Sequence, residues 1–157
     1  MPACEDYLTR QPLEDRETAF RLIEAQAQTG ALVTFEGIVR ADRSGQREVT
    51  ALFYAAYEAM ANSEMAGLVQ NAHRRWTLTG IYLRHRLGLV RTGQISLIVS
   101  VSAGHRAEAY AASEFIVEGI KHDVPIWKQI CYSDEAREWS RAGELSSGVG
   151  RKTYALV

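Results

Sequence analysis

The stretch "GIKHDVPIWKQI" (residues 119–130) places two lysines, Lys121 and Lys128, on either side of a proline. Pro125 disfavours the α conformation at Val124, so a helix that carries Lys121 is expected to end just before the proline. An extended segment is then expected to carry Lys128. The stretch therefore predicts a corner between a helix and a strand, with one amine on each side of it.

Two amines at such a corner have an ordinary interpretation and a chemical one. In the ordinary interpretation, Lys121 pairs with Glu118 on a solvated helix face, and Lys128 points outward from an edge strand. In the chemical interpretation, two ammonium groups brought close together disfavour each other's charge. One amine could then serve as a nucleophile or base while the other holds an anion. Both interpretations stay open at this point.

Periodicity on both sides of the corner predicts the other elements. Apolar residues recur at helical spacing in 13–27, 57–76 and 106–122, and alternate as in strands elsewhere. We expect a polar, mobile loop over 41–48, a turn at 91–93 and a loosely held tail over 143–157. The predicted strands are 30–40, 49–54, 80–88, 94–102 and 125–132.

The order of these elements indicates the fold class. From residue 49 it runs strand, helix, strand, strand, helix, strand, which is the split βαβ order. A chain of 157 residues suits one domain, without repeats or long linkers. We therefore expect an α+β fold with a mainly antiparallel sheet, in a single domain over residues 1–157.

Composition excludes several classes of protein. Hydrophobic residues make up 46% and charged residues 24%, and the formal net charge is −1. The chain lacks the basic excess of a general nucleic-acid binder, an apolar run long enough for a membrane span, and a signal-peptide pattern at its start. Cys4 and Cys131 show no metal-binding spacing, and Cys131 is expected to be a packed side chain. We expect a cytoplasmic protein.

The remaining polar motifs are mainly cationic. "SAGHRAEA" (102–109) ends one strand and opens a helix, where free backbone N–H groups favour an anion beside His105 and Arg106. An equally acceptable interpretation makes Ser102 a helix cap and Arg106 a surface residue. Arg40 ends another strand and has the planar donor fork that suits phosphate. Such residues suit an anionic substrate and chemistry at an acyl group.

Some conspicuous residues have simpler explanations. The cations of "RHR" (84–86) are expected to be structural, and Tyr54, Tyr57 and Trp127 are expected to pack in the core. The sequence contains no GxGxxG, P-loop, HExxH or GxSxG motif. No metal site is predicted.

Together these residues resemble a known family, the large, catalytic subunit of molybdopterin synthase. The resemblance covers roughly residues 13–130, and its most specific part is the spacing from His-Arg to the first lysine and then to "PIWK". The matching stretches are "GALVTFEGIVR" (30–40), "LFYAAYEAMA" (52–61), "RHRLGLVRTGQISLIVSVSAGHRAEAY" (84–110) and "VPIWKQ" (124–129).

The resemblance implies a fold, a reaction and partners. The fold would be an α/β hammerhead with an added antiparallel sheet. The reaction would add two sulfurs to cyclic pyranopterin monophosphate, giving the dithiolene of molybdopterin. The sulfur would arrive as a thiocarboxylate on the C-terminal Gly-Gly of a small ubiquitin-like partner, so no cofactor is expected. Large subunits would pair as a homodimer within a heterotetramer.

The resemblance also assigns roles to residues. Lys121 and Lys128 correspond to the family's catalytic lysines. The residues expected to bind substrate or other anions are Arg40, His105 and Arg106, together with the neighbours Ile38, Val39, Gln129 and Ile130.

Three positions depart from the family's pattern. Ile130 stands where an acidic residue is usual, Ala55 replaces a glutamate, and Gly104 replaces a proline. Two alternative functions follow. The chain could be a non-catalytic homologue that binds a ubiquitin-like partner or a phosphorylated ligand. On strand order alone, it could be a regulatory domain that senses a small anion.

Overall fold

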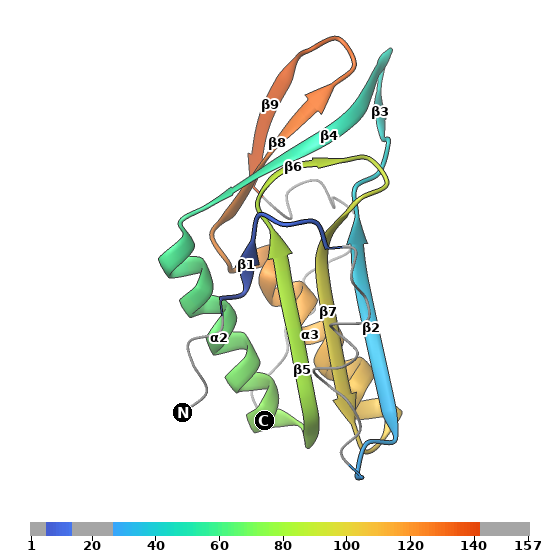
Figure 1. Cartoon of the computed structure of the whole chain (residues 1–157), viewed down its shortest axis with the longest axis vertical. Helices are drawn as coiled ribbons and strands as arrows, with labels where there is room; N and C mark the ends of the chain where they lie inside the picture. The colour runs from blue at the N-terminus through green and yellow to red at the C-terminus, as the bar shows by residue number, and fades with distance from the viewer. Residues whose placement is uncertain (1–5, 14–26, 142–157) are drawn as a thin grey trace.

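The computed structural model describes residues 6–13 and 27–141 (Figure 1). The predicted tail over 143–157 lies wholly, and the predicted helix over 13–27 almost wholly, outside the described residues. The elements in chain order are β1 (Leu8–Thr9), β2 (Ala31–Ile38), β3 (Arg43–Ser44), β4 (Arg47–Ala56), α2 (Glu58–Arg75), β5 (Leu78–Arg86), β6 (Gly88–Arg91), β7 (Ile95–Ala103), α3 (Arg106–His122), β8 (Ile126–Tyr132) and β9 (Arg137–Arg141).

These strands form two sheets. The first sheet has the order β1-β5-β7-β2, and the second has the order β3-β4-β8-β9 with β6 paired to β4. Only the β1–β5 pair is parallel among the described strands. The predicted α+β class and the mainly antiparallel pairing are confirmed. β4 and β8 pair with each other and leave β5 and β7 in another sheet, in keeping with the added antiparallel sheet that the resemblance implies.

The core lies between the first sheet and the two helices, which cover the same face of that sheet (Figure 1). Alternate residues of β7 enter this core from one side, including Val99 and Val101, which are fully buried. Ile116 and Ile120 enter it from α3 and are also buried. The apolar stripe of α3 therefore positions this helix along the first sheet.

The predicted corner at Pro125 is confirmed. Helix α3 ends at His122, and the N–H of Asp123 still donates to the carbonyl of Gly119 at 2.9 Å. β8 begins at Ile126, whose side chain is fully buried in the core. Burial of Ile126 fixes which face of β8 points inward, and so fixes the orientation of every residue that follows.

Three parts of the structure differ from the sequence predictions. The predicted loop over 41–48 contains the β3–β4 hairpin, which turns at Gly45 with a φ of 65°. β6 and β9 were not predicted, because one is four residues long and the other is rich in polar residues. Tyr54 is buried as predicted, whereas Tyr57 and Trp127 are exposed, at 60% and 42%.

None of the helices in the described ranges is long and apolar enough to cross a membrane. Cys131 is a buried free cysteine, as predicted. Arg84 donates to the backbone carbonyl of Asp6, in keeping with the structural role predicted for this part of "RHR".

His85 gives the fold an expected sensitivity to acid. Its imidazole is buried beside the Tyr54 ring, and burial lowers the pKa of His85 to about 4. An unfolded histidine has a pKa near 6.5, so the unfolded chain binds more protons than the folded chain between these values. The free energy of unfolding should therefore fall by about 3 kcal/mol as pH drops from 7 to below 4 because of this group.

Urea denaturation at several pH values measures this loss. Other groups also titrate, so the comparison is with a His85→Leu variant, whose apolar side chain fills the buried position but binds no proton. The wild type should lose more stability than the variant between pH 7 and pH 4. Equal pH dependence in the two proteins would contradict a buried neutral histidine.

Candidate functional site

Arg40, Lys121 and Lys128 come together where the two sheets meet. Lys121 lies in the last turn of α3, Lys128 lies in β8, and Arg40 follows the end of β2. Partial burial is the main cause that lowers the pKa of Lys128, and the charges of Lys121 and Arg40 lower this pKa further. The charge of Asp42 raises it. The structure thus places both lysines within electrostatic reach of each other.

Neither lysine has the ordinary role considered from the sequence. Glu118 pairs with His122, with 3.2 Å between its Oε2 and the histidine Nε2. The Nζ of Lys121 lies instead 5.6 Å from the centroid of the Phe35 ring. β8 lies between β4 and β9, so Lys128 is not on an edge strand. Among the described residues, no ion pair is formed by either lysine.

Lys128 has a cross-strand neighbour on each side of β8. Tyr54 of β4 and Ser140 of β9 are its direct partners in the two antiparallel ladders, so the three side chains share one face. Tyr54 is 8% exposed, and burial raises its pKa, opposed in part by a hydrogen bond with Ser96. The Ser96 hydroxyl in turn donates to the carbonyl of Gly37 at 3.1 Å. The buried residues Tyr54 and Ser96 therefore keep water from one side of Lys128.

The end of β2 holds Arg40 near the lysines. A β-bulge lies between Gly37 and Ile38, and Val39 exchanges backbone hydrogen bonds with the turn before β7. The Arg40 guanidinium forms an exposed ion pair with Asp42, 3.1 Å apart. Val39 is buried and Ile38 is 50% exposed, so these two predicted site neighbours face in different directions.

The predicted neighbours of Lys128 also divide between the two faces of β8. Gln129 lies on the face opposite Lys128, where it accepts a hydrogen bond from Arg137 at 3.4 Å. Ile130 shares the face of Lys128 but is buried, in a small cluster with Val49 and Tyr132. No acidic side chain therefore follows Lys128 on its own face of β8.

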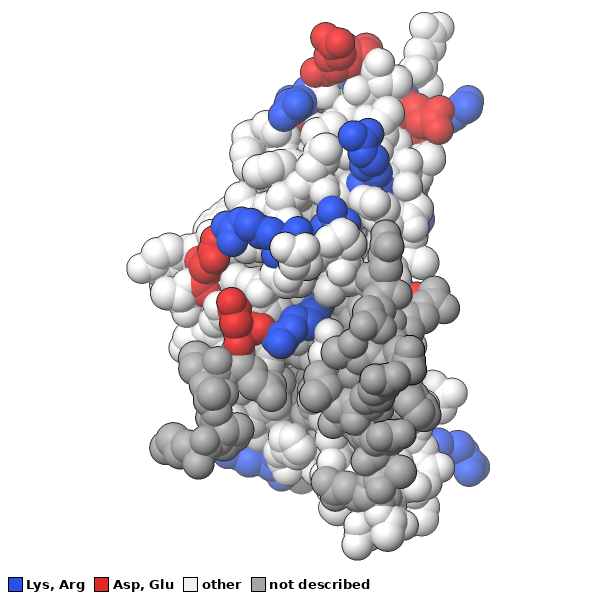
Figure 2. All heavy atoms as spheres, viewed as in Figure 1, with Lys and Arg blue, Asp and Glu red and all other residues white. Residues whose placement is uncertain are grey.

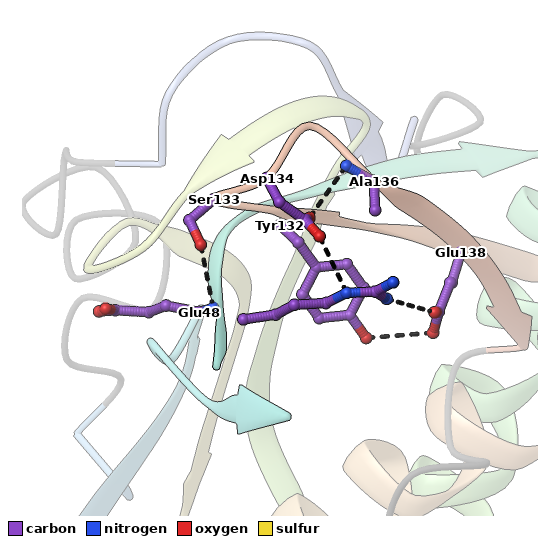
Figure 3. Close-up of polar contacts among 7 residues, drawn as sticks. Glu48, Tyr132, Ser133, Asp134, Ala136 and Glu138 are labelled. Atoms are coloured by element: carbon purple, nitrogen blue, oxygen red, sulfur yellow. Dashed lines mark hydrogen bonds and ion pairs between the residues drawn. The ribbon is translucent and has the colours of Figure 1, made fainter. Parts of the chain in front are cut away.

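The acidic residue nearest in register to Ile130 is already paired. Glu138 of β9 lies directly opposite Ile130. Its carboxylate accepts from the Arg47 guanidinium and from the Tyr132 hydroxyl, each at 3.1 Å (Figure 3). Arg47 also binds Asp134 at 2.9 Å, so both carboxylates are directed to this guanidinium. Glu138 therefore does not replace the acid that the resemblance leads us to expect at position 130.

His105 and Arg106 lie at the opposite end of α3 from Lys121. Sixteen residues separate His105 from Lys121, which corresponds to about 24 Å along a helix. Both side chains are exposed, and His105 is the N-cap residue. The structure of one chain therefore does not bring these two predicted residues to the lysines.

Ser102 is not the helix cap considered from the sequence. It is fully buried in β7, and its hydroxyl accepts a hydrogen bond from Thr79 at 2.8 Å. The turn that follows it is tightly packed, because a Cβ at Gly30 would collide with the backbone carbonyl of Gly104. Gly30 and Gly104 therefore fix how the chain enters α3.

On the one face that Figure 2 shows, the charges are mixed and do not point to another site. On the face shown in Figure 2, lysine and arginine side chains lie close to aspartate and glutamate. A shallow hollow lined by residues 73–78 and Glu108 lies beside the first turn of α3 and contains neither lysine. Within the described ranges, no group of three His, Cys, Asp or Glu side chains could hold a metal ion.

Comparisons with known proteins agree on one family. The model of the family described as "MoaE protein" matches residues 8–123. The molybdopterin synthase catalytic subunit of Thermoplasma volcanium is 42% identical over 110 residues, which are 70% of this chain and 80% of that protein. The subunit of the same name from Bacillus subtilis is 34% identical over 132 residues, which are 84% and 82% of the two chains.

Solved structures show the same fold. Molybdopterin synthase from Staphylococcus aureus superposes with a TM-score of 0.77 at 30% identity, covering 85% of this chain and 95% of that one. A complex of subunits 1 and 2 of molybdopterin-converting factor from Helicobacter pylori contains a chain with a TM-score of 0.70 at 25% identity. The match covers 85% of this chain and 88% of that one.

Proposed function

Because the chain belongs to the MoaE protein family and acts as a molybdopterin synthase catalytic subunit, we propose that Arg40, Lys121 and Lys128 form its sulfur-transfer site. The observation that carries this proposal is the pair of lysines, which lie within electrostatic reach of each other without an ion-pair partner among the described residues. The lowered pKa of Lys128 increases the fraction of neutral amine near neutral pH, and only the neutral amine can accept a proton or attack an electrophile.

The proposed substrates follow from the family. A small ubiquitin-like subunit would bring sulfur as a thiocarboxylate on its C-terminal Gly-Gly, and cyclic pyranopterin monophosphate would receive it in the cytoplasm. The bond between the sulfur and the acyl carbon of the partner breaks, and the sulfur bonds to a side-chain carbon of the pterin. The C–O bond at that carbon breaks, and its oxygen leaves with the opened cyclic phosphate or as water. Water supplies the oxygen that returns the acyl group to a carboxylate. One sulfur is used from each partner molecule, so two rounds give the dithiolene.

Each residue of the site has a proposed role. Lys128 acts as the base or nucleophile, because its pKa is lowered and its direct neighbour on β4, Tyr54, is buried. Lys121 and Arg40 hold the anionic groups, which are the pterin phosphate and the terminal carboxylate or thiocarboxylate of the partner. Asp42, which pairs with Arg40, is the counter-charge that an incoming anion displaces.

His105 and Arg106 enter this proposal through a second copy of the chain. In one chain they lie about 24 Å from Lys121 along α3, so they can assist this site only from the partner protomer of a homodimer. Their exposure at the start of a helix leaves them free to do so. The homodimer would then carry two identical shared sites, with a small subunit at each.

Mixed dimers test whether the site is shared. We expect Lys128→Ala and Arg106→Ala homodimers each to be nearly inactive. A heterodimer of the two variants contains one site with both residues intact and one site without either, so random mixing should restore about one quarter of wild-type activity. Co-expression of the two variants, followed by an activity assay, measures this. No recovery in dimers proven to be mixed would place both residues in the same protomer's site, and a fully active Arg106→Ala homodimer would place Arg106 outside the site.

The direct test of the function is a single-turnover reaction. Purified chain is mixed with a thiocarboxylated small subunit and cyclic pyranopterin monophosphate, and the dithiolene product is measured. A second sample contains the same subunit with an ordinary C-terminal carboxylate, which should give no product. Tight partner binding without product, under conditions in which the Staphylococcus aureus synthase is active, would contradict catalysis and favour a binding role.

A further inference from the structure

Ser140 carries a buried hydroxyl beside Lys128 that has no hydrogen-bond partner among the described residues. Ser140 lies in β9 directly opposite Lys128 in β8, and directly opposed residues of an antiparallel pair have Cβ atoms about 5 Å apart on one face. Buried hydroxyls in folded proteins are nearly always hydrogen-bonded, because leaving one unpaired is costly. An unpaired hydroxyl at this position therefore requires an explanation.

The other polar groups around Lys128 either repel its ammonium form or already have a hydrogen-bond or ion-pair partner. Lys121 and Arg40 repel its ammonium form, and Asp42 is paired with Arg40. On its other side along the sheet, Tyr54 hydrogen-bonds to a serine of β7. Glu138, the next residue of β9 on the same face, is held by an arginine and a tyrosine (Figure 3). In the described part of the chain, Ser140 is the neutral polar neighbour with an unused hydroxyl.

We propose that Ser140 is a positioning residue for Lys128, and that the lysine amine hydrogen-bonds to its hydroxyl during the reaction. The lysine stem already lies across the same face of the sheet, so a change of side-chain rotamer is enough to bring the amine to the hydroxyl. The expected effect on turnover rests on the proposed function, whereas the contact between Ser140 and Lys128 does not.

A hydroxyl suits a lysine that must change its protonation state. It can accept a hydrogen bond from the ammonium form and donate one to the neutral amine, so it holds both. A carboxylate in its place would bind the ammonium form more strongly and would raise the pKa of the lysine. Ser140 would therefore fix the direction of the amine without removing its basicity.

Chemical labelling of Lys128 tests this contact without the reaction. Acetic anhydride labels neutral amines, so the labelling rate of the Lys128 peptide against pH gives the apparent pKa of that amine in the folded protein. A Ser140→Asp variant should raise this pKa by about one unit, which lowers labelling below the pKa about tenfold. Ser133→Asp is the matched control, because it adds the same charge at the exposed turn of the same hairpin, about 17 Å along β8 from Lys128.

Two results would overturn the proposal. If Ser140→Asp left the labelling profile of Lys128 unchanged, the two side chains would not meet. If Ser133→Asp shifted the profile equally, the effect would be that of a distant charge. A shift confined to Ser140→Asp is the supporting result.

Turnover separates this proposal from the proposed function. Ser140→Ala should lower kcat about five- to tenfold with little change in KM, and Ser140→Thr, which restores a hydroxyl, should recover most of the rate. Failure of threonine to rescue, with its fold intact by circular dichroism, would overturn the positioning role. A labelling shift without any effect of Ser140→Ala on kcat would uphold the contact but overturn the positioning role. Lys128 as the reacting amine is tested separately, by substitution of Lys128 itself.

Discussion

Lys128→Arg is expected to stop sulfur transfer almost as completely as Lys128→Ala. Arginine keeps the positive charge but does not lose its proton in proteins, so it cannot serve as a base or a nucleophile. Positioned acid–base groups typically contribute about 10²–10⁴-fold to rate, and we expect losses in this range for both variants. The observation behind this prediction is the lowered pKa of Lys128, which burial and two nearby cations produce.

The measurement is single-turnover product formation with saturating thiocarboxylated partner. Partner affinity, measured by calorimetry, should change little, because a broad interface rather than one amine supplies most of the binding energy. A Lys128→Arg variant with a near-wild-type rate would show that only the charge of Lys128 matters. A Lys128→Ala variant with a near-wild-type rate would remove Lys128 from the site altogether.

Lys121 is expected to differ from Lys128 in its response to arginine. Lys121→Ala should lower turnover at least about 100-fold, because the site loses a cation that holds its anionic substrates. Lys121→Arg should retain a substantial part of the rate, since a guanidinium also binds anions and also stacks on an aromatic ring such as Phe35.

Rates of the two Lys121 variants at several concentrations of the pterin substrate test this assignment. If Lys121 holds an anion, arginine should restore affinity for the substrate that alanine loses. Equal loss in Lys121→Arg and Lys121→Ala would contradict the assignment and would mean that the amine of Lys121 itself reacts.

The sequence was sufficient to predict the elements that carry the lysines. The apolar stripe of α3 and the restriction that Pro125 places on Val124 are local properties, and the helix ends at His122 as they indicate. The pairing of strands is not local. Nothing in the alternation of β4 and β8 distinguishes a sheet of their own from a sheet shared with β5 and β7. The strand pattern therefore could not predict the division into two sheets, which only the added sheet implied by the resemblance indicated.

The candidate site was predicted in part for the same reason. Lys121, Lys128 and Arg40 were named from their motifs, but the contact of Lys121 with Phe35 depends on how β2 lies beside α3. Ser140 was missed because β9 has few apolar residues and gives little strand signal. The distance of His105 from Lys121, in contrast, follows from the length of the predicted helix and was available from the sequence.

The alternation along β8 has a consequence for how this chain can vary through evolution. Ile126 points into the core and Trp127 points outward, so Lys128 faces inward only because it lies an even number of residues after Ile126. Loss or gain of one residue between the buried anchor and the lysine would turn the amine to the opposite face of the sheet. Substitutions of the exposed Trp127 leave this alternation intact, whereas insertions and deletions of single codons should be strongly selected against.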